Sequence, residues 1–232
     1  MSKNKIIGFI VLSCIALVSL IYSVRPALVH SALWHSKRTV KAVFIHEIKK
    51  MNIPLISQTR NLNCESATAA MILKYYGKES NLDVIQKMLP LNGNPHKGFR
   101  GDVDGPIWGF DNYGVYAEPI AKVMTELGIP SKAYTNITTD FLKKKILEGK
   151  PSIIWINIAN PHPVTKFVDI DDEKVKLITG EHVAVVTGYE NGIWILNDPW
   201  WTNAKDGTRV GQTLYVEDLN SLMWDDFDHM AV

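Results

Sequence analysis

Cys64 is the residue best placed for nucleophilic chemistry. The segment 64–76, CESATAAMILKYY, has apolar residues at helical spacing, with Asn63 as a candidate N-cap and Gly77 as a candidate C-cap. A thiol in the first turn of a helix lies near unpaired backbone N–H groups and the positive end of the helix dipole, and both favour the thiolate. The adjacent Glu65 would partly oppose that anion. Cys64 is therefore a candidate nucleophile, and an inert buried thiol is the alternative.

Gln58 lies six residues before Cys64 and carries a side-chain amide. With the backbone N–H of Cys64, that amide could form an oxyanion hole for the tetrahedral intermediate of acyl transfer. Considered alone, Gln58 is equally a polar loop residue. The prediction therefore depends on the chemistry of Cys64.

His182 and Asp198 lie at the two ends of the segment EHVAVVTGYENGIWILNDPW, residues 181–200. His182 begins a valine-rich strand, an Asn-Gly pair makes a turn, and Asp198 ends the next strand. A two-residue turn would place His182 and Asp198 on opposite faces. A three-residue loop, with Gly192 in a left-handed bulge, would place Asp198 opposite Ala184, on the face of His182.

We expect the three-residue loop, because it completes a catalytic base. His182 could then take the proton of the thiol while Asp198 fixes the tautomer of the imidazole and stabilises its cation. The alternatives are a structural strand-end histidine and an aspartate that initiates a turn before Pro199.

Other residues give weaker signals. The remaining candidates, His46, His96, His162 and His229, lack metal-ligand spacing, so we expect no metal and no cofactor. Three tryptophans, Trp108, Trp200 and Trp201, are candidates for the wall of a cleft, with ordinary packing as the alternative. The glycine- and aromatic-rich segment 99–116 is a candidate substrate-facing loop.

The elements that would position these residues follow an order of helices first and strands afterwards. Helices are expected over 64–76, 81–88, 117–127 and 139–147, and strands over 152–158, 182–189, 193–197 and 212–216. A charged hairpin within 159–179 and a short helix near 219–224 complete the pattern. This order predicts an α+β domain with N-terminal helices packed on a C-terminal antiparallel sheet.

The composition fits one globular domain with an appendage. The chain has 232 residues, of which 46% are hydrophobic and 21% are charged. Its formal net charge of +1 comes from 25 basic and 24 acidic residues. Phosphate binding needs a concentrated basic face, so nucleic-acid binding is not expected.

The N-terminus contains an uncharged run of 19 residues, from Ile6 to Val24. That length can just cross a bilayer, so residues 1–25 are predicted to be a transmembrane anchor, with a cleaved signal segment as the alternative. Residues 26–50 would be a juxtamembrane linker and residues 51–232 the domain. With Cys14 in the apolar run, Cys64 is the only thiol of the domain.

Gln58, NCESATAAMILKYYG (63–77) and GEHVAVVTGYENGIWILNDPW (180–200) together resemble the C-39-like cysteine peptidases, papain-fold relatives of the bacteriocin-leader, double-glycine peptidases. The similarity covers about residues 51–230. It implies a papain-like fold and a triad of Cys64, His182 and Asp198, with Gln58 as oxyanion donor. The commonest family form has glycine where this chain has Glu65 and Glu181.

The resemblance implies a thiol-dependent hydrolase that cleaves peptide bonds, with a peptide or protein as its substrate. A papain-like cell-wall amidase or acyl transferase would use the same residues. A catalytically silent surface module that binds peptide or protein is a third hypothesis, because Glu65 and Glu181 could obstruct the thiol. We expect the domain to lie on the outer side of a bacterial membrane, or to be secreted if residues 1–25 are cleaved. The oligomeric state is left open.

Overall fold

The computed structural model describes residues 50–157, 160, 162–203 and 205–232. Four helices come first in this part of the chain: α3 (Cys64–Tyr75), α4 (Leu82–Met88), α5 (Ala117–Glu126) and α6 (Thr139–Leu147). Each begins and ends within about two residues of the predicted bounds. Gly77, which follows α3 with φ +70°, lies in the left-handed region that commonly ends helices.

Six strands and a short 3₁₀ helix follow. The strands are β1 (Ser152–Ile156), β2 (Thr165–Ile170), β3 (Glu173–Ile178), β4 (His182–Glu190), β5 (Ile193–Asp198) and β6 (Gln212–Val216), and the 3₁₀ helix is η1 (Leu219–Leu222). One antiparallel sheet has the order β1-β4-β5-β6, and β2 pairs with β3 in a separate hairpin. The prediction of helices followed by an antiparallel sheet is confirmed.

The β4–β5 hairpin differs from the prediction in where its extra residue lies. Glu190 pairs with Ile193, so the loop contains two residues, Asn191 and Gly192, both with positive φ. The predicted three-residue loop is therefore wrong. Asn-Gly is the favoured pair for such a turn, because its twist matches that of the strands.

A bulge inside β4 supplies the missing residue. The pairing passes from Gly188–Ile195 directly to Val186–Leu196, which leaves Thr187 without an opposite residue. The Thr187 hydroxyl donates to Ile195 O at 3.0 Å, and its carbonyl accepts from Met51 N at 2.7 Å. Beyond the bulge the register is the one that was predicted from the three-residue loop.

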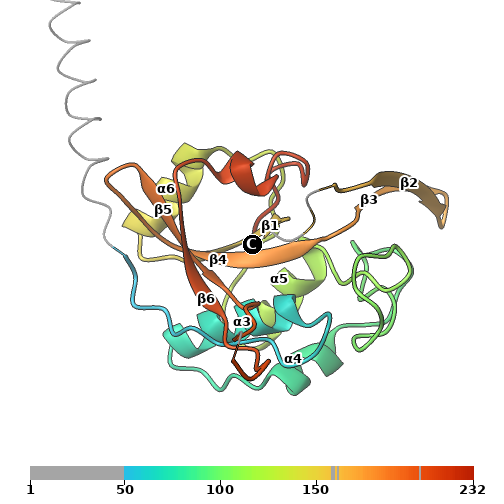
Figure 1. Cartoon of the computed structure of the whole chain (residues 1–232), viewed down its shortest axis with the longest axis horizontal. Coiled ribbons are helices and arrows are strands. Elements are labelled where there is room, and N and C mark those ends of the chain that lie inside the picture. The colour runs from blue at the N-terminus through green and yellow to red at the C-terminus, as the bar shows by residue number, and fades with distance from the viewer. Residues whose placement is uncertain (1–49, 158–159, 161, 204) are drawn as a thin grey trace, which may run out of the picture. The chain divides into compact units, whose positions relative to one another are not determined.

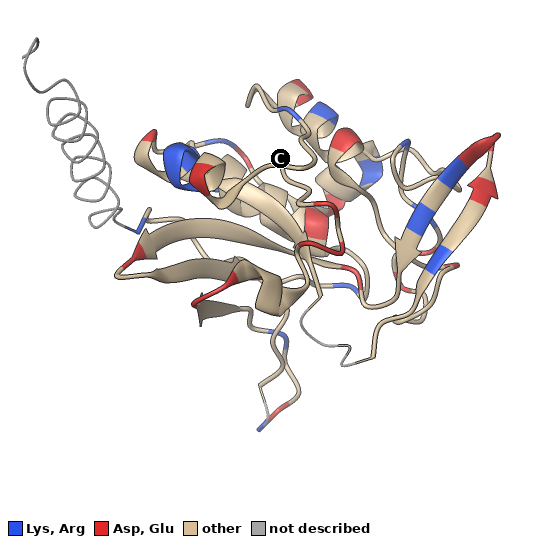
Figure 2. Cartoon of the chain, turned by 90° about the horizontal axis from the view of Figure 1, so that it is seen from above, with Lys and Arg blue, Asp and Glu red and all other residues tan. Residues whose placement is uncertain are grey.

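The sheet is buried along its middle strands and is packed against helices. Residues 182–188 of β4 are all buried, and both α3 and α6 pack on this strand. In Figure 1, α3 and α4 lie below β4 and α6 lies above it. Figure 2 shows that charged residues are frequent on the β2–β3 hairpin, whereas the middle of the main sheet carries almost none. This burial fixes the strands that carry His182 and Asp198.

The predictions for the N-terminal segments concern residues outside those described. These are the anchor or signal at 1–25 and the linker at 26–50, of which only Lys50 is described. Within the described part of the chain, no helix is both long enough and apolar enough to span a membrane.

Candidate active site

Cys64 is the first residue of α3 and is buried. The preceding Asn63 does not cap this helix with its side chain, contrary to the prediction. Its Oδ1 instead accepts from the backbone N–H groups of Thr59 and Arg60 at 3.2 and 2.9 Å. Asn63 therefore holds the loop before α3, and that loop sets the position of the thiol.

His182 and Asp198 form the hydrogen bond that the sequence predicted. His182 Nε2 lies 2.7 Å from Asp198 Oδ1, and both residues are buried. Asp198 also accepts from Trp200 N at 2.8 Å and from Gln212 Nε2 at 2.9 Å. These contacts fix the carboxylate, and because Nε2 of His182 faces it, Nδ1 is left as the basic atom of the ring.

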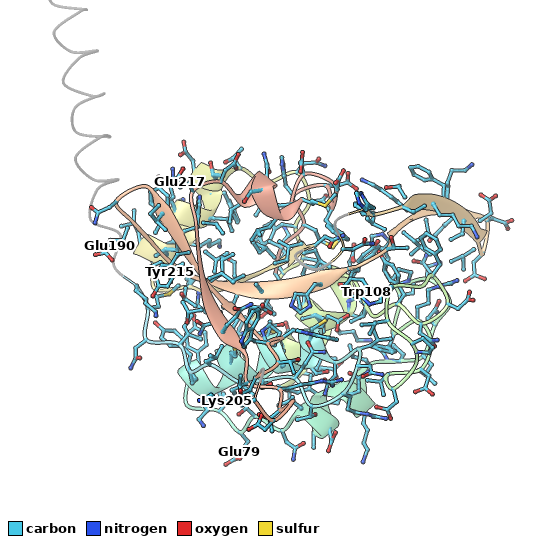
Figure 3. All side chains as sticks on the ribbon, viewed as in Figure 1. Glu79, Trp108, Glu190, Lys205, Tyr215 and Glu217 are labelled. Atoms are coloured by element: carbon cyan, nitrogen blue, oxygen red, sulfur yellow. The ribbon has the colours of Figure 1, made fainter. Side chains whose placement is uncertain are left out.

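One pocket joins the two halves of the site. Cys64, Glu181 and His182 all line it, and its wall also contains a set of apolar residues: Leu62, Ile107, Trp108, Tyr113 and Trp200. In Figure 3, Glu190 marks one end of β4, and Trp108 lies toward the opposite end, where the strand begins at His182. The segment 99–116 thus contributes to the pocket, as predicted. Of the three tryptophans, Trp201 lines a different depression.

Two carboxyl groups lie against the thiol. Cys64 Sγ donates to Glu65 Oε2 at 3.2 Å, and Glu65 Oε1 accepts from Val115 N at 2.7 Å. Glu181 has both oxygens buried without a hydrogen-bond partner among the described residues. The indole N–H of Trp155 donates to Val115 O at 3.0 Å and not to Glu181. The thiol of Cys64 therefore points its proton at the carboxyl group of Glu65.

Burial and charge both favour the neutral forms of this cluster. Burial, together with the carboxyl groups of Glu65 and Glu181, raises the pKa of the Cys64 thiol well above its usual range. Burial raises the pKa of Glu65, and burial with the charge of Glu65 raises the pKa of Glu181 strongly. The helix start was predicted to favour the thiolate, and here its effect is outweighed.

Gln58 is buried, but its amide makes contacts other than those predicted. Nε2 donates to the carbonyl oxygens of Arg60 and Asn61 at 2.9 and 3.0 Å, while Oε1 has no partner among the described residues. Both amide hydrogens are thus used within the loop before α3. The role of Gln58 as oxyanion donor stays a prediction.

Two residues that the sequence did not single out shape the site. Gly114, with φ +119°, lies so close to the carboxyl groups that a Cβ would be 2.4 Å from Glu65 Oε1 and 3.0 Å from Glu181 Oε2. Gln212 pairs with Asp198 across β5 and β6. A predicted register for β6 would have found Gln212, whereas Gly114 becomes visible only in three dimensions.

A cysteine at a helix start, with a His–Asp pair on adjacent strands, is an arrangement used by cysteine hydrolases. A model of the Peptidase_C39 like family matches residues 50–225. The chain belongs to this family, which indicates a cysteine peptidase.

The chain is similar in sequence to a curated protein and in structure to two solved chains, the first of which supports the fold. Uncharacterized protein YvpB of Bacillus subtilis (strain 168) is 28% identical over 151 residues, which cover 59% of this chain and 58% of that protein. A Bacillus anthracis crystal structure described as C39-like has a TM-score of 0.61 and 24% identity, covering 79% of this chain and 96% of its own. A double glycine motif protease from an AMS/PCAT transporter, in complex with the leader peptide, has a TM-score of 0.40 and 19% identity, covering 79% and 91%.

Proposed function

We propose that the chain is a papain-like cysteine peptidase that hydrolyses peptide amides through Cys64, His182 and Asp198. The observation that carries the proposal is the buried His182–Asp198 hydrogen bond of 2.7 Å, at a pocket that Cys64 also lines. A fixed and oriented imidazole beside a thiol is the arrangement that thiol acyl transfer requires. Membership of the family supports the same class of reaction.

In the proposed reaction, Nδ1 of His182 takes the thiol proton while Nε2–H donates to Asp198. Cys64 Sγ attacks the carbonyl carbon, and the backbone N–H of Cys64 donates to the developing oxyanion. The amine then leaves with the proton from His182, and water hydrolyses the thioester by the same route in reverse. Asp198 keeps its charge throughout and stabilises the imidazolium.

This reaction needs a rearrangement at the nucleophile. In the described conformation the thiol donates to Glu65 Oε2. That hydrogen bond must break before the thiol can donate to Nδ1 of His182. We propose that substrate entering the apolar part of the pocket favours that exchange. Gln58 would join the oxyanion hole only if its amide released the carbonyls of Arg60 and Asn61.

A second candidate function is peptide binding without hydrolysis. The contact between Cys64 and Glu65 and the raised pKa of the thiol favour it, because both oppose formation of the nucleophilic thiolate. A cell-wall amidase or acyl transferase would use the same three residues. Product analysis on peptidoglycan fragments and on linear peptides separates these reactions from peptide hydrolysis.

The proposal is tested with a thiol-directed probe that carries a peptide-like recognition group. The chain has two cysteines, so Cys64→Ala and Cys14→Ala are compared in the full-length protein. Labelling and peptide hydrolysis should disappear in Cys64→Ala and persist in Cys14→Ala, with the fold of both checked by circular dichroism. Equal labelling or hydrolysis in Cys64→Ala would overturn the proposal, and binding of peptide without any labelling of wild type would favour the silent module.

We also propose that the domain acts on the outer side of the membrane, tethered or released through residues 1–25. The apolar run from Ile6 to Val24 motivates this placement. Protease added outside intact cells should then digest the domain, unless it has already been released into the medium. Protection of the domain until the cells are lysed would contradict the placement.

A further inference from the structure

Three potential metal ligands meet beside the pocket. Cys64 Sγ and one carboxyl oxygen from each of Glu65 and Glu181 lie within 4.8 Å of one another. They come from two distant parts of the chain, the start of α3 and the residue before β4. The cluster therefore exists only in the folded domain.

The carboxyl group of Glu181 gives a second, independent observation about this cluster. Both of its carboxyl oxygens are buried, and neither accepts a hydrogen bond from any described residue. A buried carboxylate without a partner is costly, and it is satisfied either by a proton or by a cation. The other two members of the cluster are a thiol and a second carboxyl group, so neither supplies a positive charge to Glu181.

The backbone around the cluster is built for close approach. At Gly114 any Cβ would lie 2.4 Å from Glu65 Oε1 and 3.0 Å from Glu181 Oε2, so a side chain there would displace both carboxyl groups from their present positions. Val115 N holds Glu65 Oε1 at 2.7 Å, which leaves Oε2 facing Cys64 Sγ. The orientation of the ligand atoms is thus fixed by the segment 114–115.

We propose that Cys64, Glu65 and Glu181 bind one divalent cation of the zinc class. A thiolate with two carboxylates suits a borderline ion better than a hard ion such as magnesium or calcium, which prefers oxygen ligands alone. Bond lengths of about 2.0–2.3 Å would draw the three atoms slightly together. The fourth ligand would be water or Nδ1 of His182, whose Nε2 already faces Asp198, as is usual for metal-binding histidines.

Binding would displace protons and requires no redox partner. The S–H bond of Cys64 breaks and any carboxyl proton leaves, both protons pass to solvent, and the sulfur–metal bond takes the place of S–H. The ion thereby occupies the sulfur that would attack a substrate. Metal binding is independent of the proposed hydrolysis, whereas inhibition by the metal rests on the proposed function.

The test uses the full-length, chelator-treated protein with Co²⁺ as an optical probe and Zn²⁺ as its competitor. We expect a thiolate-to-cobalt absorption band that saturates at one ion per chain and disappears when Zn²⁺ is added. Cys64→Ser should remove the band. Glu181→Gln, which keeps the shape of the side chain, should weaken Co²⁺ binding by at least about tenfold.

The matched control is Glu118→Gln. Glu118 pairs with His96 on the surface and lies outside the cluster, so its variant should bind Co²⁺ like wild type. Absence of a thiolate band, or equal affinity of Glu181→Gln and wild type in folded protein, would overturn the proposed site. If the band behaves as expected but metal-free protein never hydrolyses peptide, the metal site stands and the proposed hydrolase function fails.

Discussion

The base and the nucleophile of the candidate site share a pocket but differ in their polar surroundings. On the side of the base, Asp198 accepts three hydrogen bonds, from His182, Trp200 and Gln212. On the side of the nucleophile, the thiol of Cys64 donates to the carboxyl group of Glu65, and Glu181 has no hydrogen-bond partner among the described residues.

The difference shows which half must change for catalysis. Three hydrogen bonds hold Asp198 in one geometry, and Asp198 in turn holds the ring of His182, so the base is preorganised. A buried thiol beside two carboxyl groups is held neutral, so the nucleophile is latent. In the proposed hydrolase the imidazole is thus already oriented, whereas activation of the thiol requires substrate or a change in the carboxyl groups.

The sharpest test of the preorganised half is Asp198→Asn. The amide cannot stabilise the imidazolium and can present a donor to Nε2, which favours the wrong tautomer of His182. We expect kcat to fall by roughly 10³–10⁴-fold, the order seen when a triad aspartate is replaced in other enzymes. Single-turnover hydrolysis of a peptide substrate measures this effect.

The matched control for Asp198→Asn is Asp218→Asn. Asp218 is an exposed aspartate whose side chain accepts from Asn220 N at the start of η1. It should leave kcat unchanged. An equal and small effect of both variants would mean that the His182–Asp198 bond is structural only.

Gln58→Ala tests whether the oxyanion hole forms by rearrangement. If the amide turns toward the reacting carbonyl, its loss should lower kcat by about 10²–10³-fold. If it only ties the carbonyls of Arg60 and Asn61, thermal stability should fall while kcat of the folded protein stays at the wild-type level. Measuring kcat and the unfolding midpoint on the same sample distinguishes the two roles.

Glu181→Gln tests the latency of the nucleophile. The charge of Glu181 contributes to raising the pKa of the Cys64 thiol, so a neutral amide should lower that pKa toward its ordinary value. Alkylation by iodoacetamide, which needs the thiolate, should then show its inflection at a lower pH. Each pKa unit corresponds to about tenfold more thiolate below the inflection.

The control for Glu181→Gln is again Glu118→Gln, which is distant from the thiol and should keep the wild-type alkylation profile. An unchanged profile in Glu181→Gln would show that burial alone holds Cys64 neutral. The nucleophilic half would then be latent for lack of solvent, not because of its carboxyl groups.

Local signals in the sequence predicted the elements and the identity of the His–Asp pair. Helical spacing from Cys64 and the Asn-Gly turn before Ile193 are properties of neighbouring residues, and the elements they predict are confirmed. The proximity of Glu65 and Glu181 depends on backbone that brings distant parts of the chain together. The amide direction of Gln58 depends on the conformation of its own loop, where it donates to the carbonyls of Arg60 and Asn61. Spacing along the chain gave no hint of a metal site, because its three candidate ligands are at positions 64, 65 and 181.

The register of β4 and β5 near Asp198 was predicted correctly, although the loop from which it was predicted is wrong. Periodicity requires one extra residue between His182 and Asp198, and the sequence does not say where it lies. The obvious place was the glycine-containing loop. The bulge at Thr187 depends on contacts with Met51 and Ile195, which no neighbouring residue reveals.

Gly192→Ala is the smallest expected effect and tests that assignment of the register. Gly192 has φ +88°, and an added Cβ would meet nothing within 4 Å, so the cost is backbone strain alone, about 1–2 kcal/mol of unfolding free energy. Because the bulge at Thr187 sets the register beside Asp198, kcat should not change. Gly207→Ala is the matched control, since Gly207 also has a positive φ, +72°, and open space around it but lies outside the hairpin. Urea unfolding should show similar losses for both variants, and a fall in kcat confined to Gly192→Ala would mean that the turn, not the bulge, aligns His182 with Asp198.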